Sequence, residues 1–283
     1  MSAETGIQWT DSTWNAWWGC QRVGPGCDHC YAEALDKRTG GAHWGAKADR
    51  RRTSESNWNE PMRWQAKADA FEAQHGHRRR VFCGSMMDIM DNAVPLEWSH
   101  EAFARIEACS RLDWQLLTKR IGNVESRVPL DWLRDAWPQH VGLMITVVTQ
   151  EEANRDIPKL LRLKAMYGIP WVGLSMEPLL ERVSLPDIAM DSTVVAGVVR
   201  RAPLDWVIVG GESGNGSRPF DTAWAQDIVI QCELAGVPCF VKQLGANVVK
   251  DGVSCPKTSK KGDNMLEWPE GIRVRDMPRA LAA

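Results

Sequence analysis

The sequence lacks the features that mark several classes of protein. Its 283 residues contain no internal repeat and no low-complexity tract, and the formal net charge is only -2. With 44% hydrophobic and 25% charged residues, the composition is globular and excludes a disordered chain or a coiled coil. No run reaches the roughly 18 apolar residues that a membrane-spanning helix needs. We therefore expect no membrane partner and one large α/β domain or two smaller ones.

A targeting signal is also missing from the sequence. The first 15 residues contain no basic region followed by an apolar stretch, which a secretory signal would have. We therefore expect the protein to be cytoplasmic. The chain nevertheless contains 8 Cys, and cytoplasmic thiols are kept reduced. A cluster of cysteines in this sequence therefore predicts a metal site rather than disulfides.

Short apolar runs alternate with amphipathic stretches from about residue 80 onward, which predicts βα units and a parallel sheet. The expected helices cover residues 98–110, 121–136, 151–166 and 221–235. The expected strands cover residues 14–18, 81–84, 114–118, 141–148, 171–175, 206–209 and 239–242. This pattern predicts an α/β fold, a full or partial (β/α) TIM-like barrel over 1–245, with a basic insertion at about 40–80. We expect the polar C-terminal extension, 246–283, to consist of loops with a weakly ordered end.

Polar residues and glycines follow nearly every predicted strand. In a (β/α) barrel the active site lies at the carboxyl ends of the strands, so we expect these residues to surround one cavity. They are Gly84, Ser85, Met86, Asp88, Lys119, Arg120, Thr146, Ser175, Glu177, Gly210, Gly211, Glu212 and Lys242.

The most specific motif is a glycine-rich segment with three cysteines spaced Cys-x6-Cys-x2-Cys, followed by an expected helix over residues 31–38. The three residues are Cys20, Cys27 and Cys30. Thiolates favour zinc, Cu(I) and iron–sulfur clusters. Structural zinc takes four protein ligands, so a zinc site would use His29 or His43 as the fourth. Three thiols with no fourth ligand instead match a [4Fe-4S] cluster that has one open iron.

Six segments of the sequence form a recognisable set. They are WNAWWGCQRVGPGCDHCYAE, RRRVFCGSMMDIMDNAVP, WQLLTKR, LSMEPLL, WVIVGGESGNGSRP and GVPCFVKQLG, all within residues 8–245. With these segments the chain resembles a phage-associated, radical-SAM-like protein family. The first gap between its cysteines is three residues longer than in the commonest pattern of radical S-adenosylmethionine (SAM) enzymes, Cys-x3-Cys-x2-Cys. The resemblance implies a barrel of the radical SAM type, with a [4Fe-4S] cluster and SAM as cofactors.

The resemblance also implies a reaction type and roles for particular residues. The cluster passes one electron to SAM, which splits into methionine and a 5′-deoxyadenosyl radical that abstracts hydrogen from an unactivated carbon. The implied cluster ligands are Cys20, Cys27 and Cys30. The candidates for binding SAM are Gly84, Ser85, Met86, Asp88, Thr146, Ser175, Gly210 and Gly211. The candidate catalytic residues are Glu177, Glu212 and Lys242.

Basic residues interleaved with tryptophan, around 50–52 and 77–80, are typical of surfaces that bind phosphates and stack bases. The candidate substrate-binding residues are Arg51, Arg79, Lys119 and Arg120. The phage association favours a hypermodified thymine in DNA as the substrate, rearranged by an isomerase or trimmed by a lyase. The radical SAM chemistry implies a reductant such as a flavodoxin or ferredoxin as partner, and the phage association implies the host cytoplasm as location.

Two other interpretations of the sequence stay open. The same chemistry can act on RNA, a peptide or a small metabolite. A zinc-stabilised nucleic-acid-binding protein without catalysis is the alternative from a different class. Cysteines that face the turn at 84–86 favour the enzyme, whereas a separate knuckle that includes His43 favours zinc.

Overall fold

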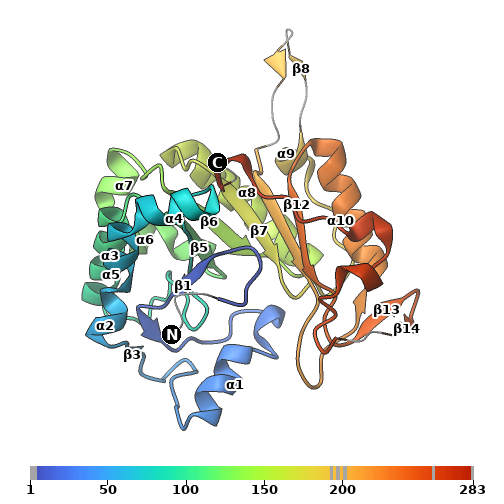
Figure 1. The fold of residues 1–283 in the computed structure, drawn as a ribbon, viewed down its shortest axis with the longest axis horizontal. Coiled ribbons are helices and arrows are strands. Elements are labelled where there is room, and N and C mark those ends of the chain that lie inside the picture. The colour runs from blue at the N-terminus through green and yellow to red at the C-terminus, as the bar shows by residue number, and fades with distance from the viewer. Residues whose placement is uncertain (1–4, 192–193, 196–197, 200–202, 257–258, 282–283) are drawn as a thin grey trace. The chain divides into compact units, whose positions relative to one another are not determined.

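The computed structural model describes residues 5–191, 194–195, 198–199, 203–256 and 259–281. Its main sheet is parallel and has the strand order β1-β4-β5-β6-β7-β10-β12 (Figure 1). The strands are β1 (Ser12–Trp14), β4 (Arg80–Cys83), β5 (Asp113–Thr118), β6 (Val141–Thr146), β7 (Val172–Met176), β10 (Trp206–Gly210) and β12 (Cys239–Gln243). The predicted α/β fold with a parallel sheet is confirmed, and the topology is compatible with a partial (β/α) barrel. None of the described helices is long and apolar enough to cross a membrane.

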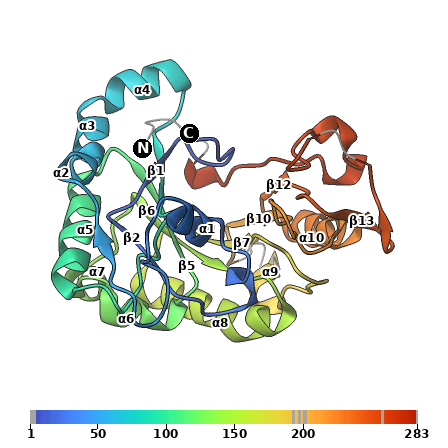
Figure 2. The same cartoon turned by 90° about the horizontal axis from the view of Figure 1, so that it is seen from below.

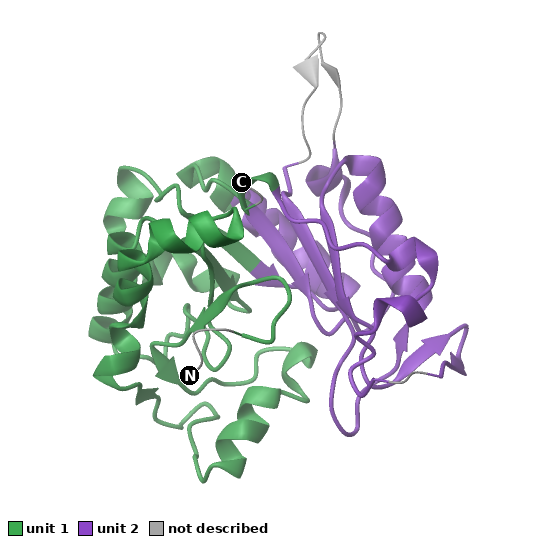
Figure 3. Ribbon diagram, viewed as in Figure 1, with its two compact units in different colours: residues 1–144, 163–171, 279–283 green, residues 145–162, 172–278 purple. Residues whose placement is uncertain are grey.

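The chain forms two compact units (Figure 3). Unit 1 consists of residues 1–144, 163–171 and 279–283, and unit 2 of residues 145–162 and 172–278. Unit 1 contains β1, β4, β5 and most of β6, whereas unit 2 contains β7, β10 and β12. The division of the sequence at residue 245 stays a prediction.

Most of the helices of unit 1 are short. Helices α3, α5 and α7 lie on the same side of the strands in two perpendicular views (Figures 1 and 2). The helices of this unit are α1 (Tyr31–Arg38), α2 (Glu55–Trp58), α3 (Glu60–Ala66), α4 (Ala68–His75), α5 (Leu96–Ala108), α6 (Val124–Arg127) and α7 (Leu130–Arg134). Short 3₁₀ turns are η1 (Pro25–Cys27), η2 (Ile121–Asn123) and η5 (Arg279–Leu281).

Buried tryptophans account for much of the core of unit 1. The Trp14 ring meets Trp58 edge-on at 5.7 Å and Trp114 at 5.5 Å between centroids. All three side chains are fully buried, at 0% exposure. Such edge-to-face pairs add to the free energy gained from burying large apolar surfaces. Burial in this core therefore accounts for three of the 15 tryptophans without a functional role.

Two expectations for unit 1 were wrong in detail. The strand expected over 14–18 is divided: β1 ends at Trp14, and β2 (Trp17–Trp18) pairs separately with β3 (Arg51–Arg52). The helix expected over 121–136 is three short pieces, η2, α6 and α7. Extended backbone at Val128 (ψ 145°) and Pro129 (ψ 140°) separates α6 from α7, because the residue before a proline avoids the helical region. Hydrophobic periodicity alone does not reveal such interruptions.

Unit 2 packs α10 (Thr222–Ala235) against β10 and β12. The side chain of Asp221 caps this helix by accepting the Ala223 amide at 2.9 Å, and Gly236 ends it with φ 68°. Helix α8 (Gln150–Tyr167) begins in this unit and α9 (Asp187–Met190) lies within it. The remaining elements are β8 (Val194–Val195), β9 (Val198–Val199), β11 (Phe220–Asp221), β13 (Val248–Lys250), β14 (Val253–Ser254), η3 (Met265–Glu267) and η4 (Glu270–Ile272).

The C-terminal extension is more structured than expected. Within the described residues, β13 and β14 join β11 in a small sheet. Trp268 is 2% exposed and Ile272 is fully buried, so the extension contributes apolar side chains to unit 2. The expectation of loops was wrong here because isolated apolar residues between polar ones carry no periodic signal.

Candidate functional site

The cysteine segment lies between β2 and α1 in unit 1. Cys20 forms an isolated bridge with Trp44, Cys27 ends η1, and Cys30 directly precedes α1. The three side chains are free thiols of intermediate exposure. The helix expected after the motif is confirmed as α1. The motif therefore presents its sulfurs from short turns and an isolated bridge rather than from an α-helix or a strand.

Both flanks of the cysteine segment are hydrogen-bonded to the turn after β4. The Gly19 amide donates to the Met86 carbonyl at 3.1 Å. The Tyr31 hydroxyl donates to the Ser85 carbonyl at 3.0 Å. The structure thus brings the segment and three of the predicted SAM-binding positions, Gly84 to Met86, next to one another.

Asn15 builds this turn and was missed in the sequence. Its side chain is fully buried, accepts the Met86 amide at 2.7 Å and donates to Ser85 Oγ at 3.1 Å. A Cβ atom at Gly84 would lie 2.7 Å from Asn15 Oδ1, so only glycine fits there. The available signal was a lone amide within the aromatic run WNAWW, where burial requires hydrogen-bond partners.

Arg120 contacts the first cysteine instead of facing solvent. Its Nη1 donates to Asp88 Oδ2 at 2.7 Å, and both terminal nitrogens lie 3.5 Å from Cys20 Sγ. The side chains of Arg120 and Asp88 are 6% and 7% exposed. Asp88 also accepts from Thr118 Oγ1 at 2.7 Å and from the Met90 amide at 3.0 Å. The buried ion pair corrects the expectation that Arg120 is an open cation for substrate.

Burial and this ion pair together set the electrostatics at Cys20. Burial and, to a smaller extent, the negative charge of Asp88 raise the pKa of the Cys20 thiol to about 11, against the opposing effect of Arg120. A metal-bound thiol is deprotonated, so any metal at Cys20 must displace a firmly held proton. The guanidinium of Arg120 is the group placed to compensate the resulting negative charge.

The arginines of the basic triplet have three different environments. Arg50 Nε donates to Asp91 Oδ2 at 2.7 Å, and both side chains are fully buried. Arg51 is exposed, with its guanidinium carbon 4.8 Å from the centre of the Trp18 ring. Arg52 stacks over Trp58 at 3.7 Å. Only Arg51 of the triplet is thus an exposed cation, and it is the one predicted to bind substrate.

The two remaining cations that were predicted to bind substrate, Arg79 and Lys119, lie at opposite ends of neighbouring parallel strands. Arg79 precedes β4, at the opposite end of that strand from Gly84. Its Nη1 donates to Ser12 Oγ at 2.8 Å, and its guanidinium stacks on Phe71 at 3.9 Å. The structure therefore separates Arg79 from the cysteine segment by the length of β4. Lys119 lies beside the Arg120–Asp88 ion pair, since its backbone amide donates to Asp88 Oδ2 at 3.0 Å.

Unit 2 contains its own cluster of predicted residues. Lys242 Nζ lies 2.9 Å from Glu177 Oε1, and Ser175 Oγ lies 3.4 Å from Glu177 Oε2. The side chains of Lys242 and Glu177 are 23% and 14% exposed. Gly210 faces the same carboxylate, because a Cβ atom there would lie 3.1 Å from Glu177 Oε1. The ends of β7, β10 and β12 thus bring four predicted residues together.

Two other predicted residues of unit 2, Gly211 and Glu212, lie directly after β10. Glu212 is 8% exposed and pairs with Arg218 at 2.8 Å. A Cβ atom at Gly211 would lie 2.1 Å from the Leu244 carbonyl, which accounts for that glycine by backbone packing. Thr146, at the end of β6, is 6% exposed. Their predicted functional roles remain predictions.

The cysteines fit a metal centre by their chemistry rather than by a preformed geometry. Among the residues that the structure describes, no three His, Cys, Asp or Glu side chains form a group that could hold a metal ion. The donor set is nevertheless three free thiols on one short segment, which suits an iron–sulfur cluster. His43, a candidate fourth zinc ligand, has Nδ1 at 2.8 Å from Asp36 Oδ1. That contact occupies one of its two ring nitrogens.

Comparison with known proteins yields a family but no characterised relative. No curated protein matches the chain, and no solved structure does. The model of a family described as "Protein of unknown function (DUF5131)" matches residues 4–272. Because that match covers nearly the whole sequence, the chain belongs to the DUF5131 family.

Proposed function

We propose that this protein is a radical SAM enzyme that acts on a modified base in DNA. The observation that supports it most is the pair of hydrogen bonds from Gly19 and Tyr31 to the turn at 84–86. A cofactor held by the cysteines and a ligand held by that turn would be neighbours. A structural zinc knuckle has no need of such a turn beside it.

The residues of unit 1 would hold the cofactors and balance their charge. When bound, a [4Fe-4S] cluster supplies the electron that cleaves SAM reductively, which enables hydrogen abstraction from an unactivated carbon. Cys20, Cys27 and Cys30 are the ligands in this proposal. The backbone around Ser85 would bind the amino group of SAM, and Arg120 would stabilise the sulfur of Cys20 by charge-assisted hydrogen bonds.

The Glu177–Lys242 pair is the candidate acid–base group of unit 2. The carboxylate of Glu177, 2.9 Å from the Lys242 ammonium, can accept hydrogen bonds from sugar hydroxyls or take a proton. Lys242 in turn can donate a proton or pair with an anionic substrate. Glu212 would have an indirect role, since its carboxylate is committed to Arg218.

The choice of DNA as substrate depends on the resemblance to phage-associated proteins. We propose a hypermodified thymine that is rearranged or trimmed, with a flavodoxin or ferredoxin as electron donor in the host cytoplasm. A base within a duplex would have to be flipped out to reach the protein. RNA, peptides and small metabolites are the alternative substrates for the same chemistry.

Metal and SAM-cleavage assays test the proposal directly. The protein is purified without oxygen, reconstituted, and analysed for iron, sulfide and zinc, then given dithionite and SAM. We expect about four iron atoms per chain and formation of 5′-deoxyadenosine. Cys20→Ala should abolish both, whereas Cys255→Ala, the same change at a half-buried thiol outside the segment, should abolish neither.

The same assays identify the zinc alternative. One tightly bound zinc per chain, with no iron uptake and no SAM cleavage by the reconstituted protein, would overturn the enzyme proposal. That result would favour a zinc-stabilised binding protein with His29 or His43 as the fourth ligand.

A further inference from the structure

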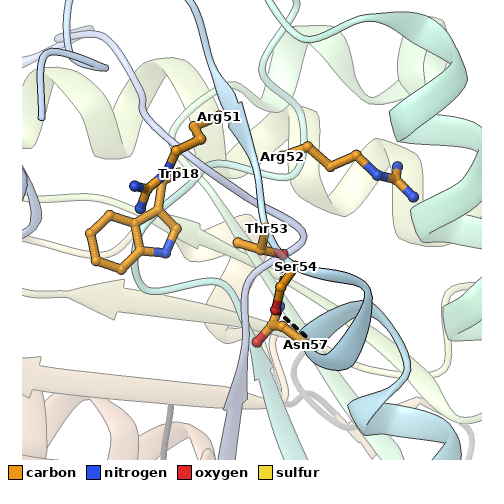
Figure 4. Close-up of a pocket in the computed structure, with 6 residues that line it drawn as sticks. All are labelled: Trp18, Arg51, Arg52, Thr53, Ser54 and Asn57. Atoms are coloured by element: carbon orange, nitrogen blue, oxygen red, sulfur yellow. Dashed lines mark hydrogen bonds between the residues drawn. The ribbon is translucent and has the colours of Figure 1, made fainter.

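A pocket of about 360 Å³ lies in unit 1 beside β2 and β3 (Figure 4). Its lining combines an indole ring, two guanidinium groups, two hydroxyls and an amide, and none of its residues is acidic. The lining residues are Trp18, Arg51, Arg52, Thr53, Ser54 and Asn57. A volume of this size is within the range of small-ligand sites. The chemistry proposed for the cysteine segment uses none of these side chains.

The pairing of two short strands creates this surface. β2 and β3 are antiparallel, with Trp18 opposite Arg51 and Trp17 opposite Arg52. Directly opposed residues share a face of a sheet, and successive residues alternate between faces. Trp17 is fully buried, whereas Trp18 is half-buried and Arg51 exposed. One face therefore belongs to the core, and the other presents a stacked indole and guanidinium to solvent.

The two arginines of the pocket differ in the charge that they can offer. Arg52 makes ion pairs with Glu101 at 2.7 Å and with Glu55 at 3.4 Å. Figure 4 shows its guanidinium directed away from Trp18, while that of Arg51 lies beside the indole. Arg51 is therefore the cation of the pocket that can meet an anionic ligand.

We propose that this pocket binds one nucleotide of a single-stranded nucleic acid. A base stacks on the half-buried Trp18 ring, and Arg51 pairs with an adjacent phosphate. The Ser54 hydroxyl and the side-chain oxygen of Asn57 lie on the same lining and offer hydrogen bonds to base edges or sugar, whereas the Asn57 side-chain nitrogen donates to the Asn15 carbonyl and Thr53 Oγ1. This chemistry distinguishes the ligand from an acidic peptide or a lipid headgroup, because those anions present no planar ring to the indole.

The position of the pocket links it to the cysteine segment. Trp18 is two residues before Cys20, so a nucleotide bound here lies near the first of the proposed cluster ligands. The inference thus deepens the proposed function by naming where its substrate strand binds. The inference rests on the proposed function only for the reaction that follows binding, because binding of the nucleic acid itself requires neither iron nor SAM.

Fluorescence anisotropy with a labelled single-stranded DNA 12-mer tests the pocket. The full-length protein and its variants are titrated at two salt concentrations, with the metal content of each preparation measured. We expect Trp18→Ala to weaken binding at least about tenfold and Trp18→Phe to retain most of it. Arg51→Ala should weaken binding and lower the salt dependence by about 0.7 in the log–log slope, the value for one lost phosphate contact. Arg134→Ala, which removes an exposed cation elsewhere in the same unit, should bind like the wild type.

Three results would overturn the pocket assignment. The first is a wild-type protein that does not bind the 12-mer. The second is binding that Trp18→Ala leaves unchanged, which indicates general attraction to polyanions. The third is a Trp18→Phe variant as weak as Trp18→Ala at equal metal content, which indicates a structural role for the indole. A wild-type protein that binds the 12-mer but does not cleave SAM would overturn the proposed function alone. The failure of the pocket assignment and the failure of the proposed function are therefore distinguishable.

Discussion

Charged side chains gather beside strand ends in both units, but their burial differs. In unit 1, Arg50–Asp91 is fully buried, and Arg120–Asp88 is 6% and 7% exposed. In unit 2, Lys242 and Glu177 are 23% and 14% exposed, and Arg218 beside Glu212 is 26% exposed. A buried pair must be kept complete because one partner left alone is an uncompensated charge. The Arg120–Asp88 pair of unit 1 also contacts the cysteine segment, through Cys20 Sγ and the Gln21 carbonyl, whereas each pair of unit 2 has at least one partner that solvent reaches.

The largest effect in this comparison is expected at Arg50. Arg50→Ala leaves the Asp91 carboxylate buried and unpaired, and frees carbonyl groups of Gly45 and Ala48. We expect the free energy of unfolding to fall by about 3–5 kcal/mol. Urea denaturation of wild type and variant, prepared in parallel, measures it. Arg111→Ala, which breaks an exposed pair with Asp69, is the control and should cost less than about 1 kcal/mol.

Asp88→Asn tests the second buried pair. The amide keeps the shape of the carboxylate but removes the charge that faces Arg120 and an acceptor for Thr118 or Lys119. We expect a loss of roughly 2–3 kcal/mol of unfolding free energy, because the hydrogen bonds involve charged groups. Thr118→Val removes a hydroxyl that donates to Asp88 and accepts the Arg120 amide, but it removes no charge, so it should cost clearly less. Equal losses for the two variants would contradict a dominant role of the ion pair.

Asp113 gives a pH dependence of known sign. Burial raises its pKa from 3.8 to about 6, despite the opposing charges of Arg78 and Arg80. The folded state therefore binds this proton more tightly than the unfolded state. The contribution of Asp113 to the free energy of unfolding is greatest below about pH 4 and is lost as the pH rises through about 6. Asp113→Asn should abolish this decrease and raise stability above pH 6 by about 1–2 kcal/mol.

Denaturation of Asp113→Asn at pH 4 to 7 measures that dependence. The same substitution at an exposed turn, Asp251→Asn, should reproduce the wild-type profile. A variant of Asp113 that is less stable than the wild type above pH 6 would show that its pairing with Arg78 outweighs desolvation.

The smallest effect on stability is expected in unit 2. Glu177→Gln breaks the ion pair with Lys242, but both groups are reached by water, so the unfolding free energy should change by less than about 1 kcal/mol. SAM cleavage should nevertheless fall in the reconstituted protein. If Glu177→Gln lowered the free energy of unfolding as much as Arg50→Ala does, the inferred difference in burial between the ion pairs of the two units would be contradicted.

Much of the fold was predictable because it depends on local patterns. The runs that became β4, β5, β6, β7, β10 and β12 were identified from their apolar character, and α5, α8 and α10 from their periodicity. Interruptions such as Pro129 and the division between Trp14 and Trp17 were not identified. The division between Trp14 and Trp17 depends on which partner strand the backbone finds, and β3 lies more than 30 residues away from β2 in the sequence. The interruption at Pro129 has a local cause, a backbone that leaves the helical region, which apolar periodicity does not register.

The candidate site was predictable in its residue types but not in its contacts. The cysteine spacing alone marked a metal site, and strand-end positions marked Glu177 and Lys242, which the structure pairs. Composition could not tell that Arg50 is buried, that Arg51 is exposed, or that Arg120 touches Cys20. Neighbouring arginines look alike in a sequence, and only the pairing of distant segments decides which of them water can reach.

The sequence by itself determined the parallel α/β architecture and the presence of three thiols on one short segment, because periodicity and spacing are properties of the chain. The tertiary structure alone decided which side chains meet. It paired Asn15 with the turn at 84–86 and Asp88 with Arg120, and it placed Trp18 opposite Arg51. Such contacts join residues far apart in the chain, and their free energy depends on burial, which no local pattern encodes.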